Sequence, residues 1–459
     1  MIKLENIDKA VRETQYAVRG PIVARAAELE RAGREIIYCN IGNPQSLGQK
    51  PLTWIRQVLA ILACPELLHS TPPMFPTDVM EMARQALQQT RHGLGAYTES
   101  QGLRFVREAV AAFIEKRDGI TADPATLFLT DGASKGVQAV LKILISSARD
   151  GIMVSIPQYP LYSATLTLYG GSRVDYYLNE DTGWTLTLEQ LEQAHQKAEK
   201  EGIQVRAICV INPGNPTGAV LDEQNIEMVF QFARKHQLAI LADEVYQDNI
   251  YQNSHAFVSF AKVLEKNRIK DVSLFSFHSC SKGLLGECGL RGGYFECRNV
   301  PAEVLAEIIK LQSVSLCANT AGQMATFLMV TPPQPGGPSF DRYTRERADM
   351  LESLRVRASM LAAGLNQIPG IACQPVAGAM YAFPRITLPA GMTDHEYCLN
   401  LLEATGICVV PGSGFGQAPG TFHFRTTLLP PIDKMQAVLA RLTGFHLSVT
   451  RSTRTQPAP

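Results

Sequence analysis

Apolar runs of strand length alternate with amphipathic stretches through the middle of the chain. Strand-type runs rich in apolar residues occupy 127–130, 152–155, 205–211, 238–242 and 271–276, and the run 238–242 is apolar throughout. Runs of this length and composition are typical of strands buried on both faces of a sheet. Because amphipathic stretches such as 137–145 separate them, the pattern from about residue 127 to about residue 296 predicts a mostly parallel sheet with crossover helices. The expected fold class is therefore α/β.

The pattern changes after this region. A Pro- and Gly-rich cluster at 331–338 interrupts it, and a long charged stretch of helical type follows at 340–365. We interpret this stretch as the entry to a smaller domain, and the polar end of the chain as a frayed tail. The sequence thus predicts an N-terminal segment (1–45), a large domain (46–330), a small C-terminal domain (331–447) and a flexible tail (448–459).

Composition agrees with a soluble enzyme of two or three domains. The 459 residues are 46% hydrophobic, with 43 Lys and Arg against 43 Asp and Glu. No basic patch indicates nucleic-acid binding, and the apolar runs are too short to span a membrane. The ten cysteines form no C-x₂-C pair, so we expect no metal site and reduced thiols. The first nine residues are too acidic and too few for a signal or transit peptide, and a cytoplasmic location is expected.

One lysine and one aspartate follow two of the predicted strands. Asp243 comes directly after 238–242, and Lys282 lies just past 271–276 before a glycine-rich turn. Side chains at the carboxyl ends of parallel strands face a common crevice. A neutral lysine amine condenses with an aldehyde, and a carboxylate keeps a pyridine nitrogen protonated, which is the pair that pyridoxal phosphate needs. The alternatives are a solvated surface lysine, and a helix cap or Mg²⁺ ligand for Asp243.

A second feature predicts an anion site. The turn 131–136 contains glycine, follows the strand 127–130 and opens an amphipathic helix. Free N–H groups and the helix dipole point at an anion bound there. Ala133, Ser134 and Lys135 are the candidate phosphate ligands, although Ser134 could equally serve only as a helix cap.

Three fragments in this order are specific together: N-P-G-N-P-T-G at 212–218, L-A-D-E-V-Y at 241–246 and S-x-S-K-G at 279–283. With them the chain resembles the class I/II, fold-type I aminotransferases from about residue 16 to about residue 446. Within that family it is similar to the alanine aminotransferase group. The resemblance implies pyridoxal 5′-phosphate as cofactor, a mostly parallel sheet flanked by helices, and a smaller α+β domain that packs with the N-terminal arm.

The resemblance also implies roles for the cofactor-binding residues. Lys282 would be the Schiff-base lysine and the proton-moving base, and Asp243 would pair with the ring nitrogen. Asn215 and Tyr246 would hold the phenolate oxygen of the cofactor, whereas a strand-end tyrosine could also simply pack in the core. The remaining assignments are phosphate contacts from Ala133, Ser134, Lys135, Ser279 and Arg291, ring stacking by Tyr159, and packing by Tyr162.

Substrate recognition requires a cation for the α-carboxylate. Arg425 lies inside the β-type segment 421–427, where an unpaired charge is costly, and it matches the family's carboxylate arginine. The alternative is a structural ion pair. Gly42, in a strip typical of the subgroup, is expected at the substrate, and Arg19 and Tyr381 could bind a distal carboxylate. Asn43-Pro44 stands where animal members have Asp-Ala, which leaves the donor open.

Finally, residues 92–98 resemble the segment by which one subunit lends a tyrosine to its neighbour. Tyr97 would make the enzyme a homodimer with composite sites; its alternative is a loop tyrosine with local contacts. The implied reaction is L-alanine plus 2-oxoglutarate giving pyruvate plus L-glutamate in two half-reactions. Alternatives are a transaminase for another small amino and oxo acid pair, such as glyoxylate, or a pyridoxal-phosphate lyase on the same fold.

Overall fold

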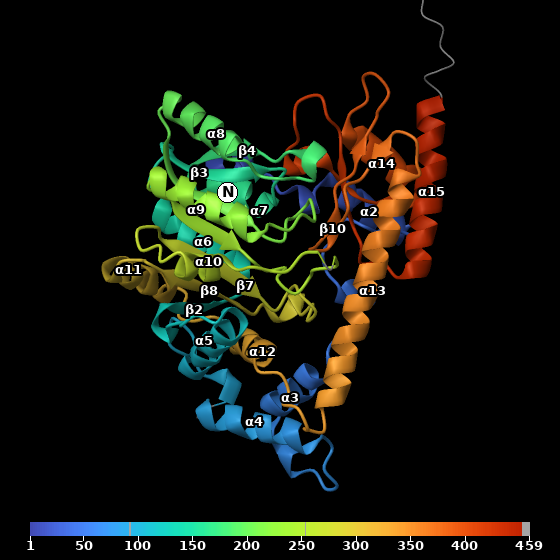
Figure 1. The fold of residues 1–459 in the computed structure, drawn as a ribbon. Helices are drawn as coiled ribbons and strands as arrows, with labels where there is room; N and C mark the ends of the chain where they lie inside the picture. Colours follow the sequence, from blue (N-terminus) through green and yellow to red (C-terminus); the bar gives the residue numbers. More distant parts are fainter. Residues whose placement is uncertain (91–92, 253, 452–459) are drawn as a thin grey trace, which may run out of the picture.

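A seven-stranded sheet forms the centre of the protein in the computed structural model, which describes residues 1–90, 93–252 and 254–451 (Figure 1). The strand order is β2-β8-β7-β6-β5-β3-β4, and within this sheet β8 alone runs antiparallel to its neighbours. The strands are β2 (Leu127–Thr130), β3 (Asp150–Ile156), β4 (Ser172–Tyr177), β5 (Gln204–Ile211), β6 (Ala239–Asp243), β7 (Leu274–Ser279) and β8 (Gly293–Arg298). This confirms the predicted α/β class.

Apolar clusters cover both faces of the sheet. Successive strand residues point to opposite faces and therefore into different clusters. Ile152 and Val154 join one cluster, and Met153 joins another. The first face packs on α6 (Ala133–Leu144), α7 (Pro160–Tyr169) and α11 (Ala302–Ser313). The second packs on α8 (Leu188–Lys200), α9 (Glu223–Lys235) and α10 (Phe260–Lys266). At the β2 end, Leu127 and Leu129 pack with α3 (Thr53–Ala63), α4 (Thr77–Gln89), α5 (Arg104–Asp118) and α12 (Thr320–Val330).

The C-terminal part of the chain stands beside the sheet, on the right in Figure 1. Its helices are α13 (Phe340–Asn366), α14 (Asp394–Thr405) and α15 (Ile432–Arg451). Its short strands are β9 (Ile371–Ala372), β10 (Tyr381–Ala382), β11 (Arg385–Ile386), β12 (Ile407–Cys408), β13 (Val410–Pro411) and β14 (Phe424–Thr427). The chain's first elements are α1 (Lys9–Glu13), α2 (Pro21–Arg31) and β1 (Ile37–Tyr38). β1 pairs in parallel with β12, and α2 contacts α14, whereas α1 contacts α7.

Several predicted boundaries move in the structure. β7 begins at Leu274 rather than at residue 271 and continues to Ser279, because its residues pair with β8 as far as Ser279. α6 begins at Ala133, directly after the glycine turn, instead of at residue 137. The predicted helix 340–365 is α13, one residue longer. The division of the chain at residues 45, 330 and 447 stays a prediction.

The first residues of the segment predicted as a tail from residue 448 are helical. Helix α15 continues to Arg451, and the hydroxyl of Ser448 donates to the carbonyl of Phe445 at 2.7 Å. Val449 packs against the apolar core, so the polar composition of this segment did not reveal its helical contact. Residues 452–459, the rest of the predicted tail, lie outside the described residues.

The described ranges contain no helix long and apolar enough to cross a membrane. Within the same ranges, no group of three or more His, Cys, Asp and Glu side chains is arranged to hold a metal ion.

Candidate active site

The ends of β6 and β7 bring the predicted lysine and aspartate to one edge of the sheet. The two strands are parallel neighbours, and Asp243 pairs in register with Phe277. Lys282 follows the end of β7 closely, and its Nζ donates to the carbonyl of Gly42 at 2.5 Å. The same Nζ lies 6.0 Å from the centre of the Tyr246 ring. A half-buried amine thus stands in a cleft formed by the sheet edge and the loop after β1.

Asp243 is a buried carboxylate with one free oxygen. Its side chain is 4% exposed, and Oδ2 accepts a hydrogen bond from the Tyr162 hydroxyl at 2.9 Å. Oδ1 is buried and has no hydrogen-bond partner among the residues that the structure describes. Burial raises the pKa of Asp243 to about 6, against the lowering effect of the Tyr162 hydrogen bond. Such an acceptor fits a protonated ring nitrogen.

Tyr162 therefore does more than the packing expected from the sequence. It is buried in α7, three residues after Tyr159, and its hydroxyl orients Asp243. The spacing between Tyr159 and Tyr162 was the sequence signal for this role, because residues three apart lie on one face of a helix.

Arg425 lies on β14 with 1% of its surface exposed. Nη1 donates to Asn215 Oδ1 at 3.2 Å, and Nη2 donates to the carbonyl of Asn40 at 2.5 Å. Its guanidinium carbon lies 4.1 Å from the ring centre of Tyr381 and 4.6 Å from that of Phe415. These partners are neutral. Arg425 is therefore not held by the structural ion pair considered above. The charge can serve an anionic ligand.

The glycine turn before α6 has the geometry of an anion site. Gly132 adopts φ +77°, and a Cβ placed there would lie 2.5 Å from Nη2 of Arg291. The same Nη2 donates to the carbonyl of Asp131 at 3.0 Å. Ala133, Ser134 and Lys135 form the first turn of α6, where free N–H groups are available.

The two serines of S-x-S-K differ in their surroundings. Ser279 is the last residue of β7 and pairs with Gly293, where an added Cβ would lie 2.9 Å from the backbone nitrogen of Ala133. Ser281 lies beside Arg291, with Oγ 3.4 Å from Nη1. Sequence reasoning missed Ser281, although it belongs to the same motif.

Aromatic hydroxyls complete the cleft. The Nδ2 of Asn215 donates to the Tyr246 hydroxyl at 3.5 Å, and this hydroxyl donates to that of Tyr381 at 3.5 Å. Tyr159, half-buried at the start of α7, shares a 2.7 Å hydrogen bond between hydroxyls with Tyr16. Burial raises the pKa of Tyr246 and of Tyr159 well above 10, so both phenols are hydrogen-bonding groups near neutral pH.

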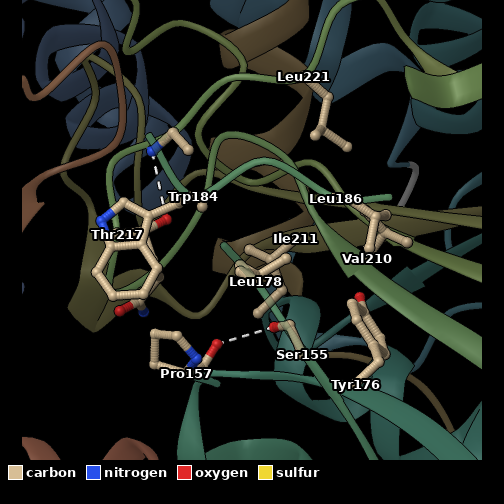
Figure 2. A pocket seen from close by; sticks show the side chains of 13 residues that line it. Ser155, Pro157, Tyr176, Leu178, Trp184, Leu186, Val210, Ile211, Thr217 and Leu221 are labelled. Carbon is tan, nitrogen blue, oxygen red and sulfur yellow. Dashed lines mark hydrogen bonds between the residues drawn. The ribbon is translucent and has the colours of Figure 1, made fainter. Parts of the chain in front are cut away.

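A small cavity of about 30 Å³ lies beside Asn215 (Figure 2). Its lining polar groups already have partners: the Ser155 hydroxyl donates to the carbonyl of Pro157 at 2.9 Å, and Thr217 accepts from the backbone of Ala219 at 3.3 Å. Most other lining side chains shown are apolar, including Trp184. The cavity has room for little more than a water molecule, so it is not a substrate site. It lies behind Asn215.

Two predicted residues stand apart from this cluster. Arg19 is exposed in the turn 17–19, and within the described ranges no hydrogen bond or ion pair ties it to the cleft. Tyr97 is 79% exposed. His92, in the same predicted segment as Tyr97, lies outside the described residues.

The residues present fit pyridoxal phosphate. Asp243 offers an unused buried acceptor, Lys282 an amine, and the start of α6 with Arg291 a site for the phosphate. Gly42 permits close approach, because a Cβ there would lie 3.1 Å from Lys282 Nζ. Arg425 adds a cation for a substrate carboxylate.

Comparison with known proteins agrees with this geometry. The family described as Aminotransferase class I and II matches residues 69–442. The chain is 48% identical over 473 residues to "Probable alanine aminotransferase, mitochondrial" of Dictyostelium discoideum, covering 97% of this chain and 89% of that protein. It is 48% identical to "Glutamate--glyoxylate aminotransferase 1" of Arabidopsis thaliana, covering 96% and 95%. Among solved structures, an alanine aminotransferase from Pyrococcus furiosus superposes with a TM-score of 0.80 at 26% identity, covering 96% and 100%.

Proposed function

We propose that this chain, which belongs to the class I and II aminotransferases, transfers the amino group of L-alanine to 2-oxoglutarate. As a member of that family it is a pyridoxal-phosphate-dependent aminotransferase. The observation that carries the proposal is that buried Asp243, buried Arg425 and half-buried Lys282 occupy one site in a chain 48% identical to a relative named as a probable alanine aminotransferase.

The cofactor, when bound, supplies an aldehyde that receives the amino group and a ring that withdraws electrons from the substrate. The chain's own residues bind, orient and move protons around it. Asp243 would accept from the ring nitrogen through its free Oδ1, and the hydrogen bond from the Tyr162 hydroxyl to Oδ2 orients the carboxylate. Asn215 and Tyr246 would hydrogen-bond the cofactor oxygen. The first turn of α6 would hold the phosphate.

Arg425 grips the substrate α-carboxylate with two nitrogens whose plane is fixed by Asn215 and Asn40. Lys282 Nζ would take the proton from the substrate Cα and deliver it to the aldehyde carbon of the cofactor, on the other side of the transferred nitrogen. The carbonyl of Gly42 holds Nζ in that position. The binding of the carboxylate by Arg425 and the position of Lys282 together determine which bond of Cα breaks.

A second acceptor, glyoxylate, has specific support, because the chain is equally similar to the glutamate–glyoxylate relative of Arabidopsis thaliana. Both reactions interconvert glutamate and 2-oxoglutarate. One binding site for the α-carboxylate therefore serves both. The two relatives named above are both aminotransferases, and the transaminase is the function we propose.

We also propose a homodimer in which Tyr97 reaches the partner's phosphate site. Tyr97 is 79% exposed, as are Val314 (82%) and Leu316 (51%). The two segments are neighbours, since the backbone N of Thr98 lies 3.4 Å from Cys317 Sγ. An exposed apolar patch of this kind suits a subunit interface. A cytoplasmic location stays a prediction from the sequence, and the Dictyostelium relative carries the word mitochondrial in its name.

The test is a spectrophotometric titration of the purified holoenzyme. L-Alanine, L-glutamate and L-aspartate are added in turn, and the visible absorbance of the bound cofactor is followed. Loss of that absorbance with alanine and glutamate, and its return with pyruvate, 2-oxoglutarate or glyoxylate, is the expected result. Conversion by another donor alone would contradict the proposed substrates. Lys282→Ala is the control, because without the amine the absorbance should not form.

A further inference from the structure

A larger cavity, of about 500 Å³, lies between the segment 47–53, helix α13 and the start of α15. A volume of this order is typical of sites for small molecules. The described side chains that line it include none of Asp243, Lys282 and Arg425. Its charged lining residues are Lys50, Arg342, Glu346, Asp349 and Arg357. The cavity is therefore distinct from the proposed active site.

Arg357, on α13, is a buried cation in the wall of this cavity, with 8% of its surface exposed. Its Nη1 donates to the carbonyls of Leu429 and Pro430, and its Nε donates to the carbonyl of Ser353 at 3.1 Å. These three acceptors are neutral. Within the described ranges, no hydrogen bond or ion pair engages Nη2. The backbone thus fixes the guanidinium and leaves Nη2 as a donor for a ligand.

The positive charge of Arg357 is not compensated by a carboxylate of the described residues. Burial lowers the pKa of Arg357, and among the described groups only Tyr251 acts against it. The carboxylate of Glu346, in the same wall, is already engaged, because it accepts from the backbone N of Thr53 at 2.9 Å and from Nε of Arg342 at 2.9 Å. A buried cation without a counter-charge is costly. An anion bound beside Arg357 would remove that cost.

The rest of the lining suits an anion that carries a carbon chain. Leu47, Met350 and Ile432 offer apolar contact within the cavity. Lys50 is exposed at the same wall, and its flexible side chain can bring an ammonium group to a bound anion. The carboxylate of Asp349 is exposed there too. Counted over the whole lining, cations exceed carboxylates by one.

We propose that this cavity is a second ligand site, in which Nη2 of Arg357 binds the carboxylate of a small organic acid and the apolar lining contacts its carbon chain. The ligand would lie between α13 and the segment 47–53, because both contribute to the wall. It binds apart from the substrate carboxylate at Arg425. The proposal goes beyond transamination and does not depend on which amino donor the enzyme uses.

The test is a titration of the holoenzyme with succinate. Calorimetry records every binding event, whereas the visible absorbance of the cofactor responds to binding at the active site. We expect one binding event per chain that leaves this absorbance unchanged, whether or not succinate also binds at the active site. If the only heat observed accompanies a change in absorbance, or if no heat is observed, the proposal is wrong.

Variants locate this absorbance-silent event. Arg357→Gln should weaken it by about 10- to 100-fold, because a hydrogen bond to a charged group is lost. Lys50→Glu, at an exposed position, should also weaken it and does not disturb the buried carbonyls that Arg357 holds. Arg355→Gln is the matched control, since Arg355 is exposed on α13 and pairs with Glu352 at 2.7 Å. Unchanged silent binding in both Arg357→Gln and Lys50→Glu, or an equal loss in Arg355→Gln, would contradict the proposal.

Inorganic phosphate distinguishes the kind of anion. It carries negative charge but no carbon chain for Leu47, Met350 and Ile432 to contact. It should therefore bind at the silent site about tenfold more weakly than succinate, the effect expected for burying two methylene groups. Equal or tighter binding of phosphate would overturn the assignment to an organic acid.

Discussion

Gly42 has no room for a side chain, because the position that a Cβ would occupy overlaps the hydroxyl of Tyr381. An added Cβ would meet that oxygen at 1.7 Å and Lys282 Nζ at 3.1 Å. Gly42→Ala should therefore displace both groups and lower kcat/KM at least about tenfold, equivalent to about 1.4 kcal/mol. Steady-state kinetics with the best donor measure this. Gly289→Ala is the matched control, since its Cβ would meet nothing within 4 Å, and equal losses in both variants would contradict the argument.

Arg425 depends on the shape of its head group as well as on its charge. Its two terminal nitrogens are held by Asn215 and by the carbonyl of Asn40, and a lysine offers only one point of attachment. Arg425→Lys should raise the KM for amino donors by about 10- to 100-fold, the range for losing a hydrogen bond to a charged group. Cofactor absorbance without substrate should stay normal. An unchanged KM for the amino donor would contradict a role of Arg425 in carboxylate binding.

The sequence revealed the charged residues of this site better than its hydroxyls. Lys282, Asp243 and Arg425 stand out because a charge beside a buried strand demands a partner. Tyr162 and Ser281 gave no such signal, since tyrosine and serine are common in helices and turns without any ligand. Their roles depend on which side chain faces them across the fold, as Asp243 faces Tyr162, and that information is absent from local pattern.

At the scale of elements, β6 and β7 place different chemistry on the two faces of the sheet. Asp243 faces α7 and the cleft, while the next residue, Glu244, points to the opposite face and accepts from the backbone N of Phe260 at the start of α10 at 2.8 Å. The His278 ring lies on that second face too, and burial lowers its pKa to about 3. Alternation along a strand therefore separates the acid predicted to bind the cofactor from a structural one.

Burial raises the pKa of Glu244 to about 8, although Arg117 acts against this. Between about pH 4.5 and about pH 8 the folded protein keeps this proton and the unfolded chain loses it, so this group makes stability fall as pH rises. Glu244→Gln keeps the acceptor oxygen but does not titrate. Relative to the wild type it should gain stability across this window by up to about 1.4 kcal/mol per pH unit.

Urea unfolding of both holoenzymes at several pH values measures the difference. Glu201→Gln, at an exposed position after α8, is the control and should show no such pH dependence relative to the wild type. A Glu244→Gln difference that is flat from about pH 4.5 to about pH 8 would show that Glu244 is ionised in the folded state.

Strand positions were predictable from apolar runs, but strand ends were not. The run 271–276 marks β7, yet the strand lies at Leu274–Ser279, because pairing with β8 continues through the polar residues His278 and Ser279. Pairing partners distant in sequence decide where a strand stops. The same limit applies to Ser448, whose helix α15 depends on contacts that its polar composition conceals.

At the scale of the whole molecule, the proposed pairing of two subunits could not be derived from composition or periodicity. Tyr97 was predicted from the family resemblance alone, and its 79% exposure fits a residue that reaches a partner. The neighbouring exposed side chains Val314 and Leu316 make this face apolar. A mixed dimer distinguishes the two sites that Tyr97 could serve.

Two inactive variants should restore activity when they are combined in one dimer. Lys282→Ala and Tyr97→Ala are co-expressed with different tags, and the mixed dimer is isolated on both. If Tyr97 serves the partner's site, one site carries both lesions and the other is intact, so the mixed dimer should have about half of the wild-type activity. If Tyr97 acts within its own subunit, neither site is intact, and activity should not exceed half of that of the Tyr97→Ala homodimer. A monomer in solution would contradict the composite site directly.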